Sequence, residues 1–318
     1  MSKRVLITRE IPEAGLRPLQ GFELFVLSKG PPGRDELLEA AKGTNGILST
    51  LTESVDADLI KAAGDTLEVV ANMAVGYDNI DLDAAKEKGV VVTNTPDVLT
   101  ETTADTAFML LLAAARRLGE GERIVRSGRW EGWGPKQLTG PDVWGKRLGI
   151  IGFGRIGQAV ACRARGFDME ILYSARSRKE DAEEELGGRH LELDELLRES
   201  DFVSIHAPLS EESRHLIGEA ELERMKPGAV LVNTSRGPIV DEAALAGALE
   251  SGRIFAAGLD VYEEEPAVHP KLLELENVIL APHIGSASIE ARNKMASLAA
   301  ENLAAVLRGE EPKNPVNV

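Results

Sequence analysis

The sequence contains a single cysteine and no long run of apolar residues. Cys162 cannot form a disulfide within the chain, which fits a reducing cytoplasm. We expect its side chain to lie in the core because it follows Ala159, Val160 and Ala161. A membrane-spanning helix needs about 20 predominantly apolar residues, so the sequence excludes one. The apolar run at residues 5–7 is too short for the hydrophobic part of a signal peptide, and we expect a cytoplasmic protein.

Basic residues are outnumbered by acidic ones. The sequence has 36 Lys and Arg residues against 52 Asp and Glu residues, which gives a net charge of -16. This charge disfavours contact with phosphate backbones or anionic lipids, so we expect neither nucleic acid nor a membrane as a partner. An anionic metabolite would be repelled at long range and would need a cation inside its binding site. No His, Cys and Asp cluster has the spacing of a metal site, and we expect no metal.

The length of 318 residues is about twice that of a usual single domain, which predicts two domains. Short Val-, Ile- and Leu-rich runs alternate with helix-compatible segments, a pattern typical of parallel βαβ units. In the first third of the chain we predict strands at Arg4–Ile7, Gly46–Ser49, Glu68–Ala71 and Val90–Thr93. A second series is predicted at Leu148–Ile151, Glu170–Tyr173, Phe202–His206, Val230–Asn233, Ala256–Asp260 and Val278–Leu280.

Two helices and an irregular segment complete this interpretation. Thr102–Leu118 is predicted as a buried helix with Thr102 as its N-cap. Gly119–Lys146 holds all three tryptophans among glycines and prolines, which indicates an excursion from the fold rather than a core element. A final helix is expected from Ser288 through Leu307, where glycine and proline follow.

A glycine-rich fingerprint follows the predicted strand Leu148–Ile151. Gly152, Gly154 and Gly157 form the pattern G-x-G-x-x-G at the start of a helix. Such glycines permit the tight turn, the close approach of the backbone to a pyrophosphate, and helix–strand packing. The predicted dinucleotide contacts in this loop are Gly152, Phe153, Gly154, Arg155, Ile156 and Gly157. The alternative is a glycine-rich turn in an ordinary α/β protein, but a six-strand series begins at this motif.

The end of the next strand indicates which dinucleotide is bound. An NAD site usually places a carboxylate there, about 20 residues into the motif. This sequence instead has Ser174, Ala175, Arg176 and Ser177, followed by Arg178. A 2′-phosphate would meet no acidic repulsion there, so we predict that NADPH is used at least as well as NADH. The alternative is that the two arginines belong to a solvated loop.

Several further motifs occur in a fixed order along almost the whole chain. They are Ala74–Asp81, Asn94–Pro96, Glu101–Asp105, Gly152–Gly157, Val232–Gly237, Gly258–Pro266 and Pro282–Ser286. In these motifs the chain resembles the D-isomer-specific 2-hydroxyacid dehydrogenases. Trp130–Pro135 and Leu172–Arg176 are similar to the glyoxylate/hydroxypyruvate reductases within that family.

The resemblance implies a fold and a division into domains. Periodicity alone suggests two consecutive domains that meet near the tryptophan-rich segment. The family resemblance implies two Rossmann-like, doubly wound α/β domains with a cleft between them. A flavodoxin-like substrate-binding domain would comprise residues 1–98 and 287–318, and a Rossmann domain that binds NAD(P) would comprise residues 99–286. A homodimer would also be expected, with contacts through residues 102–146.

The resemblance places Arg236, Glu265 and His283 in the active site. Reduction of a 2-oxo acid needs a hydride, a proton for the developing alkoxide and a cation for the carboxylate. His283 is the suitable proton donor, since an imidazole can exchange a proton near neutral pH. Glu265 would orient the imidazole, although three consecutive glutamates in isolation indicate a solvated loop. Arg236 offers a planar fork that matches a carboxylate.

The remaining site residues follow from the same resemblance. Val75 and Gly76 would present N–H groups to the substrate carboxylate, and Leu51 would form a pocket wall. The dinucleotide would contact Ala207, Thr234, Ser235, Asp260, Gly285 and Thr103, with Asp260 at the nicotinamide side. Among the other histidines, His206 is expected to be a satisfied structural residue, and exposed positions are expected for His190, His215 and His269.

We therefore predict reduction of a small 2-oxo acid, glyoxylate or hydroxypyruvate, to the D-2-hydroxy acid with NADPH or NADH. Alternatives within the family are D-3-phosphoglycerate, D-lactate and phosphite dehydrogenases. Formate dehydrogenases are similar too but carry Gln where this sequence has Glu265. A non-enzymatic alternative is a dinucleotide-sensing binding protein, like the transcriptional corepressors that share this fold.

Overall fold

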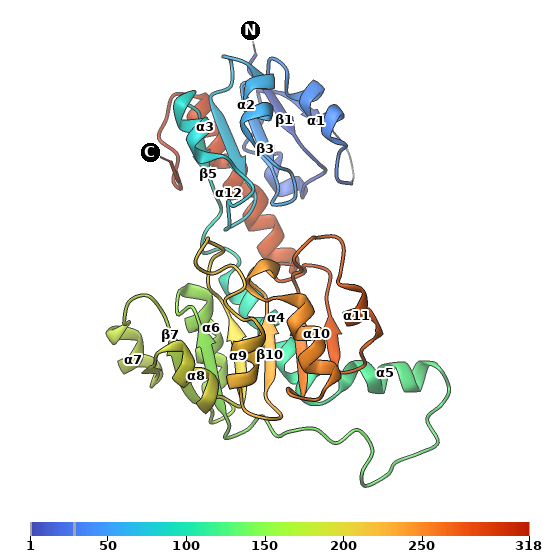
Figure 1. The fold of residues 1–318 in the computed structure, drawn as a ribbon. Helices are drawn as coiled ribbons and strands as arrows, with labels where there is room; N and C mark the ends of the chain where they lie inside the picture. The colour runs from blue at the N-terminus through green and yellow to red at the C-terminus, as the bar shows by residue number, and fades with distance from the viewer. Residues whose placement is uncertain (1, 28–29, 318) are drawn as a thin grey trace. The chain divides into compact units, whose positions relative to one another are not determined.

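The structure, a computed structural model, describes residues 2–27 and 30–317 of the chain. It divides into two compact units, Met1–Leu99 with Ala287–Val318, and Thr100–Ser286. The chain thus leaves the first unit once and returns to it for its last helix (Figure 1).

The first unit contains a five-stranded parallel sheet in the order β2-β1-β3-β4-β5. The strand order reverses between β1 and β3, as in flavodoxin-like folds, and ligands of such sheets bind beyond the carboxyl ends of the strands at this point. The strands are β1 (Arg4–Ile7), β2 (Glu23–Val26), β3 (Gly46–Ser49), β4 (Val69–Asn72) and β5 (Val91–Thr93).

Helices cover both faces of this sheet. α12 (Ile289–Leu307) begins after its N-cap Ser288 and packs on β3, β4 and β5 with the short 3-10 helix η1 (Glu13–Gly15). On the other face, buried side chains of α1 (Arg34–Ala41), α2 (Ala57–Ala63) and α3 (Leu82–Glu87) meet alternate strand residues such as Leu6 and Ile47. Two-sided coverage explains why the central strands β3 and β4 are buried along their whole length and consist mostly of apolar residues.

The second unit contains a seven-stranded parallel sheet in the order β12-β11-β10-β9-β6-β7-β8. Six of these strands have the Rossmann order, which reverses between β6 and β9, and β12 extends it. The strands are β6 (Arg147–Ile151), β7 (Glu170–Ser174), β8 (Arg189–His190), β9 (Phe202–Ile205), β10 (Val230–Asn233), β11 (Ala256–Leu259) and β12 (Val278–Leu280). Both sheets together confirm the predicted fold class.

Two layers of helices enclose this sheet (Figure 1). One core forms under α4, α6 and α7, and the other under α8, α9, α10 and α11. The helices of the unit are α4 (Thr100–Ala115), α5 (Leu118–Arg126), α6 (Arg155–Arg165), α7 (Glu180–Leu186), α8 (Leu193–Glu199), α9 (Glu219–Arg224), α10 (Glu242–Glu250) and α11 (Pro270–Glu274), with the 3-10 helix η2 (Gly237–Ile239).

All ten predicted strands are present in the structure, but not every boundary matches. Four match residue for residue (β1, β3, β10 and β12), and six differ by one residue at one or both ends. The sequence interpretation missed β2 and β8. All four residues of β2 are exposed at the sheet edge, and β8 has only two residues. Neither therefore has the buried apolar run by which the other strands were predicted.

The segment after α4 was only partly predicted. The helix begins at Thr100, so Thr102 lies inside it and is not its N-cap. It ends at Ala115 because Arg117 adopts a left-handed conformation (φ 52°), and a separate helix, α5, follows. The expectation of an irregular excursion from Gly119 was therefore wrong for α5. The three tryptophans are exposed, as expected of an excursion.

The prediction that Cys162 lies in the core is wrong, since its thiol is exposed. Cys162 lies on α6, whose residues Ala159, Val160, Ala161 and Ala164 are buried. Only about half of the residues of such a helix lie on its buried face, and position 162 lies on the exposed face. Sequence neighbours of a helical residue do not share its face.

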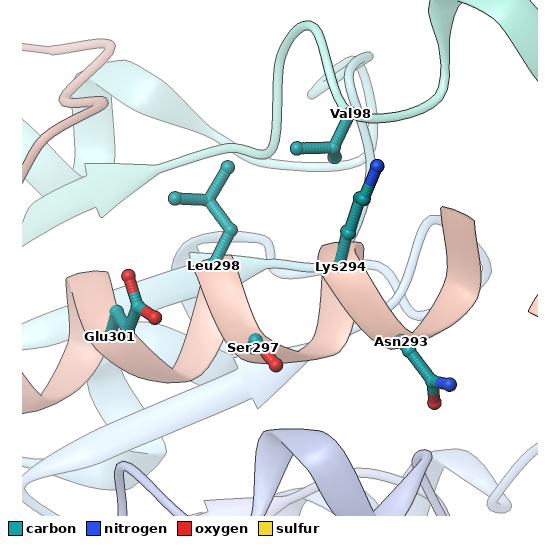
Figure 2. A pocket seen from close by; sticks show the side chains of 6 residues that line it. All are labelled: Val98, Asn293, Lys294, Ser297, Leu298 and Glu301. Atoms are coloured by element: carbon teal, nitrogen blue, oxygen red, sulfur yellow. The ribbon is translucent and has the colours of Figure 1, made fainter. Parts of the chain in front are cut away.

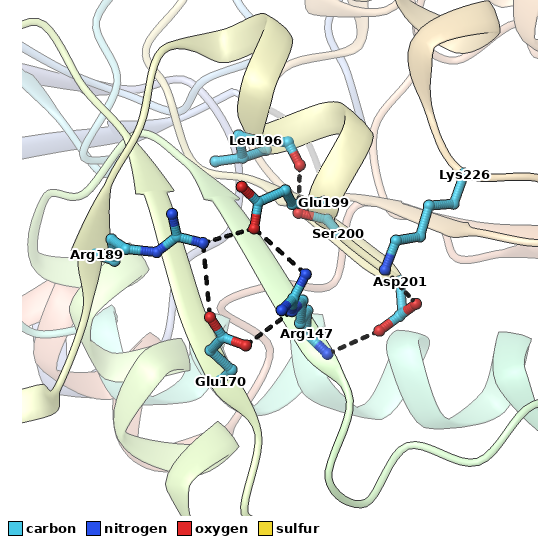
Figure 3. A network of polar contacts seen from close by, with 8 residues as sticks. All are labelled: Arg147, Glu170, Arg189, Leu196, Glu199, Ser200, Asp201 and Lys226. Atoms are coloured by element: carbon cyan, nitrogen blue, oxygen red, sulfur yellow. Dashed lines mark hydrogen bonds and ion pairs between the residues drawn. The ribbon is translucent and has the colours of Figure 1, made fainter.

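The amino ends of the strands in the second sheet carry a network of charged side chains (Figure 3). Arg147 pairs with Glu170 (2.7 Å) and Glu199 (3.3 Å), and Arg189 pairs with Glu199 at 2.5 Å. Beside them, Lys226 Nζ lies 2.8 Å from Asp201 Oδ1. Burial would raise the pKa of Asp201, but hydrogen bonds from Lys226 and from the Arg147 N–H outweigh it and lower the pKa.

We expect Lys226→Met to destabilise the protein at pH 7 by about 0.5–1 kcal/mol, the range for a partly exposed pair. A carboxyl whose pKa is lowered on folding stabilises the native state above its ordinary pKa, and this contribution disappears as pH falls through the folded value. The difference from wild type should therefore shrink between pH 5 and pH 3 on urea unfolding. Lys271→Met, which breaks a more exposed pair with Glu250, is the control. A difference that grew toward pH 3 would contradict the assignment.

Candidate active site

The glycine fingerprint forms the turn between β6 and α6, at the reversal point of the second sheet. Gly152 has a φ of 89°, and a Cβ added there would lie 2.5 Å from the N atom of Ala207 at the end of β9. A Cβ on Gly157 would lie 2.3 Å from the Gly152 carbonyl oxygen. Gly154, the N-cap of α6, is exposed with open space around it. The first N–H groups of α6 have no partner within the helix, which fits a pyrophosphate at this point.

The side chains of the fingerprint loop have different surroundings. Phe153 is 1% exposed, and its ring stacks on Tyr173 with centroids 4.1 Å apart. Its side chain therefore belongs to the core, and only its main chain can contact a ligand. Arg155 is exposed on the first turn of α6, while Ile156 is half-buried. Of these three residues, only Arg155 can bring a charged side chain to a phosphate.

The two arginines after β7 differ in how closely their side chains are held by other residues. Arg178 Nε and Nη2 both bond the Glu183 carboxylate, at distances from 2.7 to 3.0 Å. Arg176 is 78% exposed, with longer contacts to Ser210 (3.3 Å) and Glu212 (3.4 Å). Ser174 and Ala175 are half-buried and Ser177 is exposed. Arg176 is therefore better placed than Arg178 to change partner when a ligand binds.

The structure brings His283 and Glu265 together. His283 Nδ1 lies 2.8 Å from Glu265 Oε2, and the side chains are 24% and 31% exposed. Glu265 Oε1 also accepts a hydrogen bond from the Tyr262 N–H at 3.2 Å. Burial raises the pKa of Glu265, but its contact with His283 and the charge of Arg236 outweigh burial and lower the pKa. Glu265 is therefore ionised at neutral pH.

The loop that carries His283 is held by Asp260, a fully buried residue after β11. One carboxylate oxygen accepts the Ile284 N–H and the other accepts the Gly285 N–H, each at 2.7 Å. The Asp260 carbonyl oxygen accepts the N–H of His283 at 2.9 Å. Burial raises the pKa of Asp260 despite these N–H donors. Both oxygens of this carboxylate thus bond the His283 loop, a contact that sequence reasoning did not foresee.

Thr103 of α4 lies beside the same loop. A Cβ added to Gly285 would lie 3.5 Å from the Thr103 methyl carbon, and Thr106 Oγ1 donates to the Gly285 carbonyl oxygen at 3.3 Å. These contacts bring the predicted dinucleotide residues Thr103, Gly285 and Asp260 together.

Arg236 lies in the turn after β10. Its Nη1 donates to the Ser235 carbonyl oxygen at 2.8 Å. The turn is held by Asn233, which is buried, accepts the Ser235 N–H at 3.0 Å and donates to the Arg236 carbonyl oxygen at 2.9 Å. Ser235 Oγ also bonds the carbonyl oxygen of Ala207, and Thr234 Oγ1 is buried with no partner in the described chain. Sequence reasoning missed Asn233, although an amide just before a Thr-Ser turn is a common turn signal.

The predicted substrate residues of the first unit lie after β3 and β4. The carbonyl oxygens of Val75 and Gly76 accept hydrogen bonds from Asn94 (2.8 Å) and Asn72 (2.9 Å), respectively. Within residues 2–27 and 30–317, neither residue's N–H donates a hydrogen bond. Leu51 is half-buried after β3. The two N–H groups are thus available to an anion.

The other histidines differ from one another. Burial lowers the pKa of His206 to about 4, and its Nε2 lies 2.8 Å from Ser204 Oγ, which confirms a satisfied structural residue. His215 is exposed, as expected. The expectation of exposure was wrong for His190, whose ring packs on Tyr173, and for His269, which is half-buried.

A separate cavity lies within the first unit. It has a volume of about 330 Å³ and is lined by Val98 and by residues of α12. Figure 2 shows Lys294 and Leu298 extending from α12 toward Val98. None of the predicted site residues lines this cavity.

The described residues contain neither a candidate metal cluster nor a candidate membrane span. No group of three or more His, Cys, Asp or Glu side chains there could hold a metal ion. No helix in the described part of the chain is long and apolar enough to span a membrane.

Comparisons with known proteins agree with one another. Residues 108–285 match the family described as D-isomer specific 2-hydroxyacid dehydrogenase, NAD binding domain. The glyoxylate reductase of Thermococcus litoralis is 51% identical over 323 residues, 100% of this chain and 97% of the relative. That of Korarchaeum cryptofilum is 54% identical over 322 residues, 100% and 96% of the two chains. An NADPH-dependent glyoxylate/hydroxypyruvate reductase from Sinorhizobium meliloti, solved with NADP and malonate, matches with a TM-score of 0.87 and 37% identity over 99% of this chain and 97% of that one.

Proposed function

Because the chain belongs to the D-isomer-specific 2-hydroxyacid dehydrogenases, we propose that it reduces glyoxylate and hydroxypyruvate to glycolate and D-glycerate. It is an NAD(P)-dependent oxidoreductase. The observation that carries the proposed reaction is the hydrogen-bonded pair of His283 and Glu265, with the charge of Arg236 acting on the same carboxylate. These residues follow three neighbouring strands, β12, β11 and β10.

Each of these residues has a distinct task. When bound, the reduced nicotinamide supplies a hydride. His283 Nδ1 faces Glu265, so Nε2 is the nitrogen that can hold the proton for the substrate's carbonyl oxygen. Glu265 fixes the ring and balances the charge of the protonated imidazole. Arg236 binds the substrate carboxylate and polarises the carbonyl, and Val75 and Gly76 offer further N–H donors.

The direct test is NADPH and NADH oxidation by the purified protein against a panel of 2-oxo acids. We expect the highest kcat/KM with glyoxylate or hydroxypyruvate, and lower values with pyruvate and 3-phosphohydroxypyruvate. A clear preference for either of the last two would replace the proposed substrate. Absence of turnover with all of them would favour a dinucleotide-sensing binding protein.

We also propose NADPH as the preferred coenzyme, with Arg176 binding the 2′-phosphate. Arg176→Ala is expected to lower kcat/KM for NADPH by about tenfold, the usual effect of one charge-assisted contact, and to leave NADH unchanged. Arg178→Ala is the matched control, because that side chain is already bound to Glu183. A strong preference of the unmodified enzyme for NADH would contradict the proposal.

A homodimer and a cytoplasmic location complete the proposal. α5 has no buried residue, and Leu118 and Val125 on it are 62% and 60% exposed. Trp133 in the following segment is 83% exposed. Apolar surface of this kind commonly marks a protein–protein contact. Sedimentation velocity should give the mass of two chains, and a monomer at micromolar concentration would overturn this part of the proposal.

A further inference from the structure

Glu242, the first residue of α10, has a buried carboxylate that accepts two main-chain hydrogen bonds. The residue is 6% exposed. Its Oε1 accepts the Glu263 N–H at 2.9 Å, and its Oε2 accepts the His269 N–H at 3.2 Å. A buried carboxylate is stable only where its oxygens are hydrogen-bonded. Glu242 thus bonds both ends of the segment between Glu263 and His269.

Glu263 makes a reciprocal hydrogen bond with Glu242. Its Oε1 accepts the Glu242 N–H at 2.7 Å, so each carboxylate accepts the main-chain N–H of the other residue. Its Oε2 lies 2.8 Å from Nε2 of His215. We call Glu242, Glu263 and His215 the glutamate clamp. The clamp joins the first turn of α10 to the loop that follows β11.

The clamp also reaches the turn that carries Arg236. The His215 N–H donates to the Pro238 carbonyl oxygen at 2.8 Å, and Pro238 lies in η2, two residues after Arg236. A Cβ added to Gly237 would lie 1.8 Å from the carbonyl carbon of Tyr262, so the two main chains are in direct contact there. Two of the predicted catalytic loops are therefore packed and bonded against each other.

We propose that Glu242 is a positioning residue for the reaction, because it fixes the loop from Tyr262 to Glu265 so that the Glu265 carboxylate meets His283. The proposal rests on the proposed function, in which His283 donates a proton and Glu265 orients it. The connection is short: Glu265 is two residues beyond Glu263, and its Oε1 accepts the N–H of Tyr262, the residue before Glu263. Small displacements of a catalytic group of this kind can lower turnover by up to about 100-fold.

Glu242→Gln tests the proposal with almost no change in volume. One of the two N–H donors would then face an amide NH₂ rather than an oxygen, so one end of the loop is released. We expect kcat for glyoxylate reduction to fall by about tenfold, with KM for NADPH within about twofold of wild type. The alkaline limb of the pH–rate profile should move to lower pH, because the proton donor is less well paired.

Glu264→Gln is the matched control. Glu264 lies in the loop of Glu263 and Glu265, and its side chain is exposed. The substitution removes one negative charge, as Glu242→Gln does, and should leave both kcat and the pH profile unchanged. An equal loss in both variants would show a general charge effect and overturn the proposal.

A double-mutant cycle separates positioning from simple stabilisation. If Glu242 acts through Glu265, then Glu242→Gln should lower kcat only slightly in an enzyme that already carries Glu265→Gln. The proposal would be overturned if the double variant lost kcat by the product of the two single losses. It would also be overturned if Glu242→Gln alone left kcat unchanged. If Glu265→Gln alone does not lower kcat, the proposed function of the pair fails instead.

His215→Ala keeps the test valid if Glu242→Gln does not fold. His215 lies on the exposed side of the clamp, with 44% of its side chain accessible. Removing it should lower kcat by about two- to threefold and shift the alkaline limb in the same direction. An unchanged kcat and pH profile in a folded His215→Ala protein would count against the clamp.

Discussion

Replacement of His283 by glutamine is expected to lower kcat for glyoxylate reduction by about 10³-fold while NADPH still binds. Positioned general acids contribute about 10²–10⁴ in rate, and glutamine has no proton to donate at neutral pH. Its amide can still accept or donate a hydrogen bond toward Glu265, which preserves the local geometry. The dinucleotide contacts predicted from the fingerprint lie at β6 and α6, on other elements.

The measurement pairs steady-state kcat with a fluorescence titration of NADPH. His215→Gln is the comparison, since that ring faces Glu263 rather than Glu265, and its kcat should fall by no more than about two- to threefold. Turnover within tenfold of wild type in His283→Gln would defeat the proton-donor assignment. Loss of NADPH binding along with turnover would instead indicate a disordered loop.

Replacement of Arg236 by lysine is expected to lower kcat/KM for glyoxylate by about 100-fold. Replacement by glutamine should lower it by about tenfold more. Lysine keeps the charge but not the planar fork that binds a carboxylate through two parallel N–H donors. Glutamine loses the charge as well, in a chain whose net charge of -16 repels anions. The loss should appear in both kcat and KM, because Arg236 binds the substrate and polarises its carbonyl.

Arg198→Lys provides the matched control for this substitution. Arg198 is an exposed arginine paired with Asp194 on α8, and its replacement should not change the kinetics. Equal kcat/KM for the lysine and glutamine variants at Arg236 would show that charge has no part in binding. If only the affinity for NADPH were lowered, Arg236 would bind the coenzyme rather than the substrate.

The fold could be predicted from the sequence wherever a strand is buried on both faces. Val230–Asn233 begins with three apolar residues and is buried along its length, and its predicted boundaries match β10. The edge strand Glu23–Val26 and the helix Leu118–Arg126 contain exposed apolar residues, so burial patterns do not identify them. Cys162 shows a related limit, because apolar neighbours in sequence lie on a different helix face.

Only some residues of the candidate site could be identified from the sequence. The motifs identify His283 and Glu265, and the structure brings the two side chains to 2.8 Å. Glu242 could not be predicted, because its importance lies in contacts between α10 and a distant loop. A glutamate at the start of a helix normally indicates only a favourable interaction with the helix dipole. Only the three-dimensional structure shows that its oxygens bond the loop of Glu265.

The ion-pair network of Figure 3 offers room for engineering the thermal tolerance of this protein. All strands of the second sheet are parallel, so their amino ends collect Arg147, Glu170 and Arg189, whereas Arg236 and His283 follow carboxyl ends. A strand of four or five residues separates the two edges by about 15 Å, which exceeds the screening length of about 8 Å at physiological salt. Charges at the amino edge can therefore be exchanged, reversed or extended into larger networks with little effect on the proton and hydride chemistry at the opposite edge.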